Sequence, residues 1–96
     1  MIKNNLEIKY QSCLLVDALH RNINDRFHSV SFEMYGSEVQ VKIIVNERTD
    51  IEDEYIDDLM AEFIARQDIK DIRKAIVDVG QKSIPLANIV YQKMYF

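Results

Sequence analysis

The sequence has few of the residues that cross-link very small domains or that form common catalytic and cofactor-binding motifs. Its 96 residues include one cysteine (Cys13), one proline, two glycines and no tryptophan. A single cysteine excludes an internal disulfide and favours a reducing compartment. Two glycines cannot form a glycine-rich phosphate loop, and no metal-ligand spacing such as Cys-x-x-Cys or His-x-x-x-His is present. We therefore expect no cofactor and no metal, and a protein that is not an enzyme.

Long hydrophobic runs are also missing near the N-terminus. The longest apolar run in the first twenty residues, 13–16, has four residues. A signal peptide or a membrane helix needs a longer run, so we expect a cytoplasmic protein. Apolar residues nevertheless make up 48% of the chain, which argues against disorder, and the length fits a single domain over residues 1–96.

Acidic residues are concentrated in one segment. The formal net charge is −4, and residues 47–62 hold eight acids and one base, Arg48. The rest of the chain holds eight acids and eleven bases, a balance of +3. This segment would repel a phosphate backbone, which argues against nucleic-acid binding, whereas it would attract a basic protein surface.

Two segments have the periodicity of amphipathic helices. The first covers about residues 5–24, with Asn5 as its N-cap. Its predicted buried face consists of Ile8, Leu15, Val16, Leu19 and Ile23. In the second, Thr49 and Glu52 fit a capping box, and the helix should end near Gln67. Its predicted buried stripe consists of Ile56, Leu59, Met60 and Phe63.

A β-hairpin is the clearest prediction. SVSFEMY and EVQVKIIV both alternate apolar and polar residues, and the Gly36-Ser37 loop between them suits a type II′ turn. The register that places all apolar residues on one face pairs Tyr35 with Glu38, Met34 with Val39, Phe32 with Val41 and Val30 with Ile43. Ile44 is apolar on the otherwise polar face, which indicates that this face is partly covered, for example by a dimer partner.

The last third of the chain allows two interpretations. DIKDIRKAIVDVG can form a helix, with Ile69, Ile72, Ile76 and Val79 on one face, or a strand over about residues 72–79. The strand is preferred because a terminal strand, about residues 88–95, needs a partner. The predicted fold is then α+β, in the order α-β-β-α-β-β, with two helices packed on one face of a four-stranded, mainly antiparallel sheet.

The acidic helix is the candidate partner-binding site. Its members are Asp50, Asp53, Glu54, Tyr55, Asp57, Asp58 and Glu62. Several of the acids form like-charge i, i+4 pairs, which destabilise an isolated helix, so a helix shaped only for stability would mix in lysines. The alternative is a solvated face that only promotes solubility. Tyr55 fits an interface anchor and the edge of the core equally well.

For Cys13, a small buried hydrophobic residue is the expected role, since His20, seven residues further along the same helix, lies beyond hydrogen-bond reach. The i, i+4 carboxylate pairs of the acidic helix are too exposed for a dedicated metal site.

The order of a leading helix, the hairpin SVSFEMYGSEVQVKIIV, the acidic helix ending DLMAEFIA and the closing segment IPLANIVYQKMY resembles a class of small bacterial immunity proteins. These proteins accompany contact-dependent and other polymorphic toxins. The resemblance implies a cytoplasmic protein that binds and neutralises one cognate toxin domain, often a basic nuclease, by covering its active site or nucleic-acid groove with acidic side chains. No site residue is carried over, because no binding motif is fixed in position.

Our hypothesis is therefore an immunity protein or inhibitor that binds a cognate, basic toxin domain through the acidic helix. One alternative is a structural or regulatory domain that forms a homodimer through its sheet. Another is a phage-type inhibitor of a host enzyme, which would use the same electrostatics.

Overall fold

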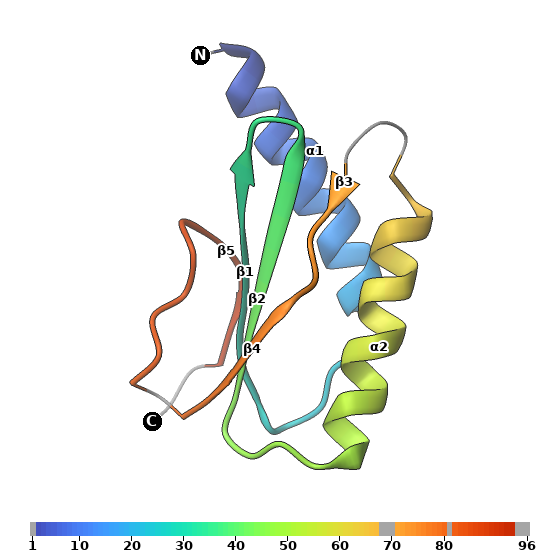
Figure 1. Ribbon diagram of the computed structural model, residues 1–96, viewed down its shortest axis with the longest axis vertical. Helices are drawn as coiled ribbons and strands as arrows, with labels where there is room; N and C mark the ends of the chain where they lie inside the picture. Colours follow the sequence, from blue (N-terminus) through green and yellow to red (C-terminus); the bar gives the residue numbers. More distant parts are fainter. Residues whose placement is uncertain (1, 68–70, 81, 94–96) are drawn as a thin grey trace.

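The computed structural model describes residues 2–67, 71–80 and 82–93 and has an α+β fold (Figure 1). Two helices accompany a mixed sheet of five strands. In chain order the elements are α1 (Ile2–Leu19), β1 (Phe27–Tyr35), β2 (Glu38–Val45), α2 (Asp50–Ala65), β3 (Asp71–Ile72), β4 (Ile76–Val79) and β5 (Asn88–Gln92).

The predicted hairpin is confirmed, including its register. β1 and β2 are antiparallel, and all four predicted pairs, from Tyr35–Glu38 to Val30–Ile43, are found. Gly36 has a φ of 62°, and no described residue other than glycine has a positive φ. A type I′ turn needs a positive φ at both central residues, so the backbone at Gly36 and Ser37 follows the type II′ pattern instead.

The prediction of a four-stranded, mainly antiparallel sheet is confirmed only in part, because the sheet has five strands and is mixed. The strand order is β3-β2-β1-β5, and β4 also pairs with β2. β1 is antiparallel to both β2 and β5, whereas β3 and β4 run parallel to β2. The physical reason is the connection: α2 carries the chain back along the sheet after β2, so the next strand on that edge runs in the same direction as β2.

The interpretation of residues 72–79 as a strand is confirmed, but a bulge divides the strand. Val39 pairs with Ile72 and Lys42 pairs with Ile76, so three steps along β2 correspond to four along the edge. One extra residue therefore lies between β3 and β4. Ile69 of the rejected helix, and residues 94 and 95 of the predicted last strand, lie outside the described residues.

Both helices lie on the same side of the hairpin, as predicted (Figure 1). The buried hydrophobic core joins them to the sheet and consists of Leu15, Ala18, Leu19, Phe27, Val30, Phe32, Val39, Val41, Ile43, Val45, Ile56, Leu59 and Phe63. The predicted stripe of α2 is thereby confirmed, with Met60 partly buried at its border.

The first helix differs from its prediction at both ends. It begins at Ile2 rather than at Asn5 and ends at Leu19 rather than near residue 24. Val16, expected in the core, is 45% exposed, whereas Gln11 is fully buried. The amides of Gln11 and Gln67 donate to each other's oxygens at 2.9 and 2.8 Å, so a reciprocal pair joins α1 to the end of α2. Gln11 therefore lies on the buried face of α1, for which the sequence predicted only apolar residues, and Gln67 satisfies its amide.

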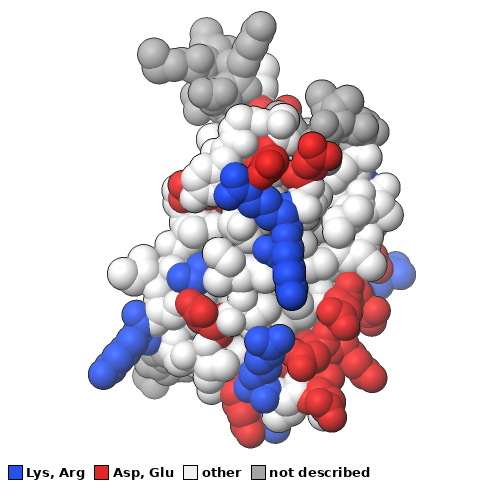
Figure 2. Space-filling model, viewed as in Figure 1, with Lys and Arg blue, Asp and Glu red and all other residues white. Residues whose placement is uncertain are grey.

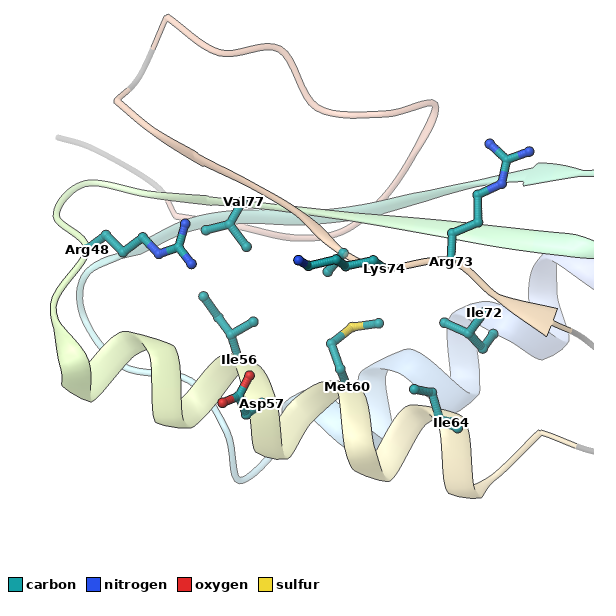
Figure 3. Close-up of a pocket in the computed structure, with 10 residues that line it drawn as sticks. Arg48, Ile56, Asp57, Met60, Ile64, Ile72, Arg73, Lys74 and Val77 are labelled. Carbon is teal, nitrogen blue, oxygen red and sulfur yellow. The ribbon is translucent and has the colours of Figure 1, made fainter.

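The opposite face of the sheet is covered by the segment between β4 and β5, which we call the strap (residue 80 and residues 82–87). The Lys42 ammonium donates to Ile84 O at 2.7 Å, and Leu86 N donates to the Ser31 hydroxyl at 2.8 Å. Figure 3 shows the strap and α2 on opposite sides of the strands. Ile44 is fully buried on this face. The prediction that the polar face is partly covered is confirmed, and the cover is the protein's own chain rather than a dimer partner.

Candidate protein-binding surface on helix α2

The acidic helix starts where its sequence predicts. Thr49 is the N-cap, in extended conformation with φ −122° and ψ 179°, and its side chain accepts from Ile51 N. Both halves of the capping box with Glu52 are present. Asp50, Glu52 and Asp53 lie in the first turn, where carboxylates interact favourably with the positive end of the helix dipole.

Glu52 does not belong to the acidic surface, because its side chain is fully buried. Its carboxylate accepts from Thr49 N at 2.8 Å and from the Asn24 side-chain amide at 2.7 Å, and Arg26 approaches to 3.4 Å. Hydrogen bonds from the Thr49 and Asn24 side chains are the main cause that lowers the pKa of Glu52 from 4.5 to about 2. Glu52 therefore ties the start of α2 to the loop before β1.

The remaining acids of α2 form one continuous surface, which we call the acidic surface. Its members are Asp50, Asp53, Glu54, Asp57, Asp58 and Glu62; Asp53 and Glu62 are partly buried and the others exposed. Figure 2 shows acidic side chains gathered over the lower part of α2 in that view. The buried stripe of α2 occupies the opposite side of the helix, so the helical period turns these carboxylates towards solvent.

Counter-charges reach only one edge of this surface. Arg48, in the loop before α2, donates to Asp53 at 2.7 Å, and both side chains are nearly half exposed. In residues 2–67, 71–80 and 82–93, no ion pair involves Asp50, Glu54, Asp57, Asp58 or Glu62. The negative potential of the surface is thus largely uncompensated by the residues that the structure describes.

Tyr55 lies at the edge of the core, which is one of the two roles considered for it. Its ring meets Phe27 edge-on, with the centroids 6.4 Å apart and an interplanar angle of 87°. It is partly buried and packs against the hydrophobic core cluster. The Tyr55 ring therefore stabilises the packing of α2 on the sheet and does not stand out from the acidic surface.

A groove separates α2 from the edge of the sheet. It has a volume of about 410 Å³, and its residues come from the loop before α2, from α2 itself and from the edge strand. They are Arg48, Ile56, Asp57, Met60, Ile64, Ile72, Arg73, Lys74, Ala75 and Val77 (Figure 3). The floor is apolar and the borders are charged, which is the composition of a site for an amphipathic ligand.

Other residues considered for chemistry do not converge. Cys13 is exposed, so the expectation of a small buried residue was wrong. His20 lines a shallow cavity of about 270 Å³ with Asp17, Arg21, Glu62 and Arg66. Within the described part of the chain, no three His, Cys, Asp or Glu side chains are grouped so that they could share a metal ion.

Sequence reasoning missed the cationic part of the groove. Arg73 and Lys74 were treated as part of a strand, and only the bulge between β3 and β4 places Lys74 beside α2. The pairing of strands across the βαβ connection is not visible in local periodicity. A break in the alternation at RKA, the bulge segment, was the one available signal.

No protein-family model matches the chain, and no curated protein matches it either. Neither helix in the part of the chain that the structure describes has the length and apolarity needed to span a bilayer.

Proposed function

We propose that the protein is an immunity-type inhibitor that binds and neutralises a cognate basic protein, a toxin domain, through the acidic surface of α2. The observation that carries this proposal is the set of carboxylates on the exposed side of the helix that have no cation partner among the described residues. They are Asp50, Glu54, Asp57, Asp58 and Glu62. A basic nuclease domain has the charge that this surface attracts.

Docking of a cationic partner would relieve electrostatic repulsion between carboxylates of α2 in the free protein. Asp58 lies one turn from both Glu54 and Glu62, and like charges at this spacing repel each other. Lysine or arginine side chains of a partner would replace repulsion with attraction. Because exposed charges are screened by salt, the surface acts mainly on the association rate.

Apolar contacts for a longer-lived complex lie beside the charges. Ile51 and Ile64, near the two ends of α2, are 55% and 52% exposed. Both border the acidic surface, so a partner that covers the carboxylates also removes apolar area from water. Such desolvated anchors slow dissociation, which complements the effect of charge on association.

A homodimer through the polar face of the sheet gains no support from the fold. Ile44, the residue that suggested a cover, is already fully buried within one chain. The strap occupies this face through hydrogen bonds to Ser31 and Lys42. A second copy would have to displace these bonds before it could dock there.

The test compares three baits on columns loaded with lysate of the source organism. They are the natural protein, Asp57→Lys/Asp58→Lys, and Asp25→Lys/Asp71→Lys, which has the same net charge but changes exposed acids outside α2. We expect one basic protein to be retained by the natural and control baits, released by high salt, and lost from the α2 variant. That protein should be toxic when expressed alone and neutralised by co-expression of the natural protein.

Equal retention on all three columns would contradict the assignment to α2. A retained protein that shows no toxicity alone, or that the Asp57→Lys/Asp58→Lys variant neutralises equally well, would contradict the inhibitor function.

A further inference from the structure

The outer edge of β4 presents backbone groups that no described residue uses. Val45 pairs with Val79, and Gly80 N donates to Val45 O at 2.9 Å. In a parallel ladder with this bond, the residues on either side of Val79 bond to β2, and Val79 itself directs its N–H and C=O away from the sheet. The alternation places Val77 in the same orientation.

The groove described above lies directly beside these free groups. Val77 lines it from the strand, and Ile56 and Met60 line it from α2 (Figure 3). Successive side chains of a strand point to opposite faces of a sheet. Every second side chain of a segment added to β4 would therefore point to the side of the sheet that α2 covers, over the apolar floor. Val79, at the end of β4, is 57% exposed and would be covered by the same segment.

One cation of the groove is left without an ion pair in the described ranges. Arg48 is paired with Asp53, and Arg73 is paired with Glu38 while its guanidinium lies 4.7 Å from the centroid of the Tyr35 ring. Figure 3 shows the guanidinium group of Arg73 pointing away from the groove and Lys74 extending along the strand wall.

The bulge holds Lys74 in this position. Its carbonyl accepts from the side-chain amide of Gln40 at 2.9 Å, and Gln40 is only 8% exposed. Bulges at sheet edges redirect side chains in this way. The ammonium group therefore lies beside the strand edge without an ion pair to any described residue, and Asp57, on the opposite wall of the groove, belongs to the acidic surface.

We propose that the groove binds an extended segment of a partner protein, which adds as a strand to β4. The segment inserts one apolar side chain between β4 and α2 and places an acidic side chain, two residues away, against Lys74. Main-chain bonds to Val77 and Val79 supply affinity, and the apolar floor and the ammonium group supply selectivity. The proposal does not depend on the function of the acidic surface, since it uses the edge of the sheet and a charge of opposite sign.

The probe is a set of synthetic peptides of about nine residues in an alternating threonine–serine background. The central residue is leucine or serine, and the residue two positions later is glutamate, lysine or serine. Fluorescence anisotropy should show that the leucine–glutamate peptide binds most tightly and that Lys74→Glu reverses the preference between glutamate and lysine. Val79→Pro removes one outward N–H without touching the β2 ladder, so it should weaken binding about tenfold. Val79→Ala keeps that N–H and is the matched control.

Amide hydrogen exchange of the natural protein gives a second measurement that needs no variant. Exchange at Val77 and Val79 should slow when the leucine–glutamate peptide is added, because the added strand bonds both amides. Unchanged exchange at these two amides overturns strand addition, as does a folded Val79→Pro variant that binds as tightly as Val79→Ala. An unchanged peptide preference in Lys74→Glu overturns the role of Lys74. If no peptide binds but a basic partner is still retained through the acidic surface, strand addition to β4 is overturned and the proposed function of the acidic surface is not.

Discussion

Replacing Asp58 with lysine should make the protein more stable. Asp58 is exposed in the third turn of α2, one turn from Glu54 and Glu62, and forms no ion pair with a described residue. The substitution removes two repulsive i, i+4 pairs and creates two attractive ones. Each of these four changes contributes a few tenths of a kcal/mol, so the free energy of unfolding should rise by about 1 kcal/mol. For a domain of this size that corresponds to an increase in Tm of about 5 °C.

Thermal unfolding followed by circular dichroism at low and high salt tests this reasoning. At 1 M salt the Debye length falls to about 3 Å, so most of the gain should disappear. Asp58→Asn removes the repulsion without adding attraction and should give about half the effect. Asp25→Lys makes the same charge change outside a helix and should leave Tm nearly unchanged.

An unchanged or lower Tm for Asp58→Lys at low salt would refute the claim that α2 is held in a repulsive state. A gain of the same size at 1 M salt would show that its origin is not electrostatic. If the gain is found and the same variant no longer binds the partner, stability and binding place opposite demands on this residue, as expected for a functional surface.

Two further predictions concern the start of α2. Thr49→Ala removes the N-cap and should lower the free energy of unfolding by about 1 kcal/mol in a denaturant titration, and no change would contradict the cap geometry. Because the pKa of Glu52 is lowered from 4.5 to about 2, its carboxylate stabilises the fold above the unfolded-state pKa, and this contribution is lost as the pH falls towards 2. The stability advantage of the natural protein over Glu52→Gln should therefore shrink between about pH 5 and pH 2, and an advantage that stays constant over this range would contradict the assigned pKa shift.

The parts of the fold that follow from local sequence were predicted well. The register of the hairpin depends on an alternation of period two that a slip of one residue would destroy, and the observed pairs agree with it. The cap at Thr49 also depends only on near neighbours. Both features are specified by residues within a few positions of one another, so no knowledge of the rest of the chain was needed.

Features that depend on distant partners were missed. Gln11 is buried because Gln67, 56 residues later, satisfies its amide, and no local pattern reveals this pairing. The parallel direction of β4 follows from the path of α2 across the sheet, and the groove beside it exists only because of that path. For the candidate site, the sequence gives the acids of the helix and the capping-box role of Glu52, but local patterns do not reveal that the Glu52 side chain is fully buried or that Lys74 lines the groove beside α2.

Buried hydrophobic residues are unevenly distributed between the first two-thirds of the chain and the rest, and this affects which part of the molecule unfolds first. Every fully or nearly fully buried hydrophobic residue in the described ranges lies at or before Phe63. β4 and β5 pair with the two edges of the hairpin, and the strap forms hydrogen bonds with its outer face. Their side chains that pack against the core, Val77, Val90 and Tyr91, are only partly buried. β4, the strap and β5 contribute fewer buried apolar side chains than the helices and the hairpin do, so this region should open at a lower free energy. The helices and the hairpin thus form the more stable part of the molecule. The edge that we expect to receive a partner strand belongs to the part that opens more easily, which consists of β4, the strap and β5.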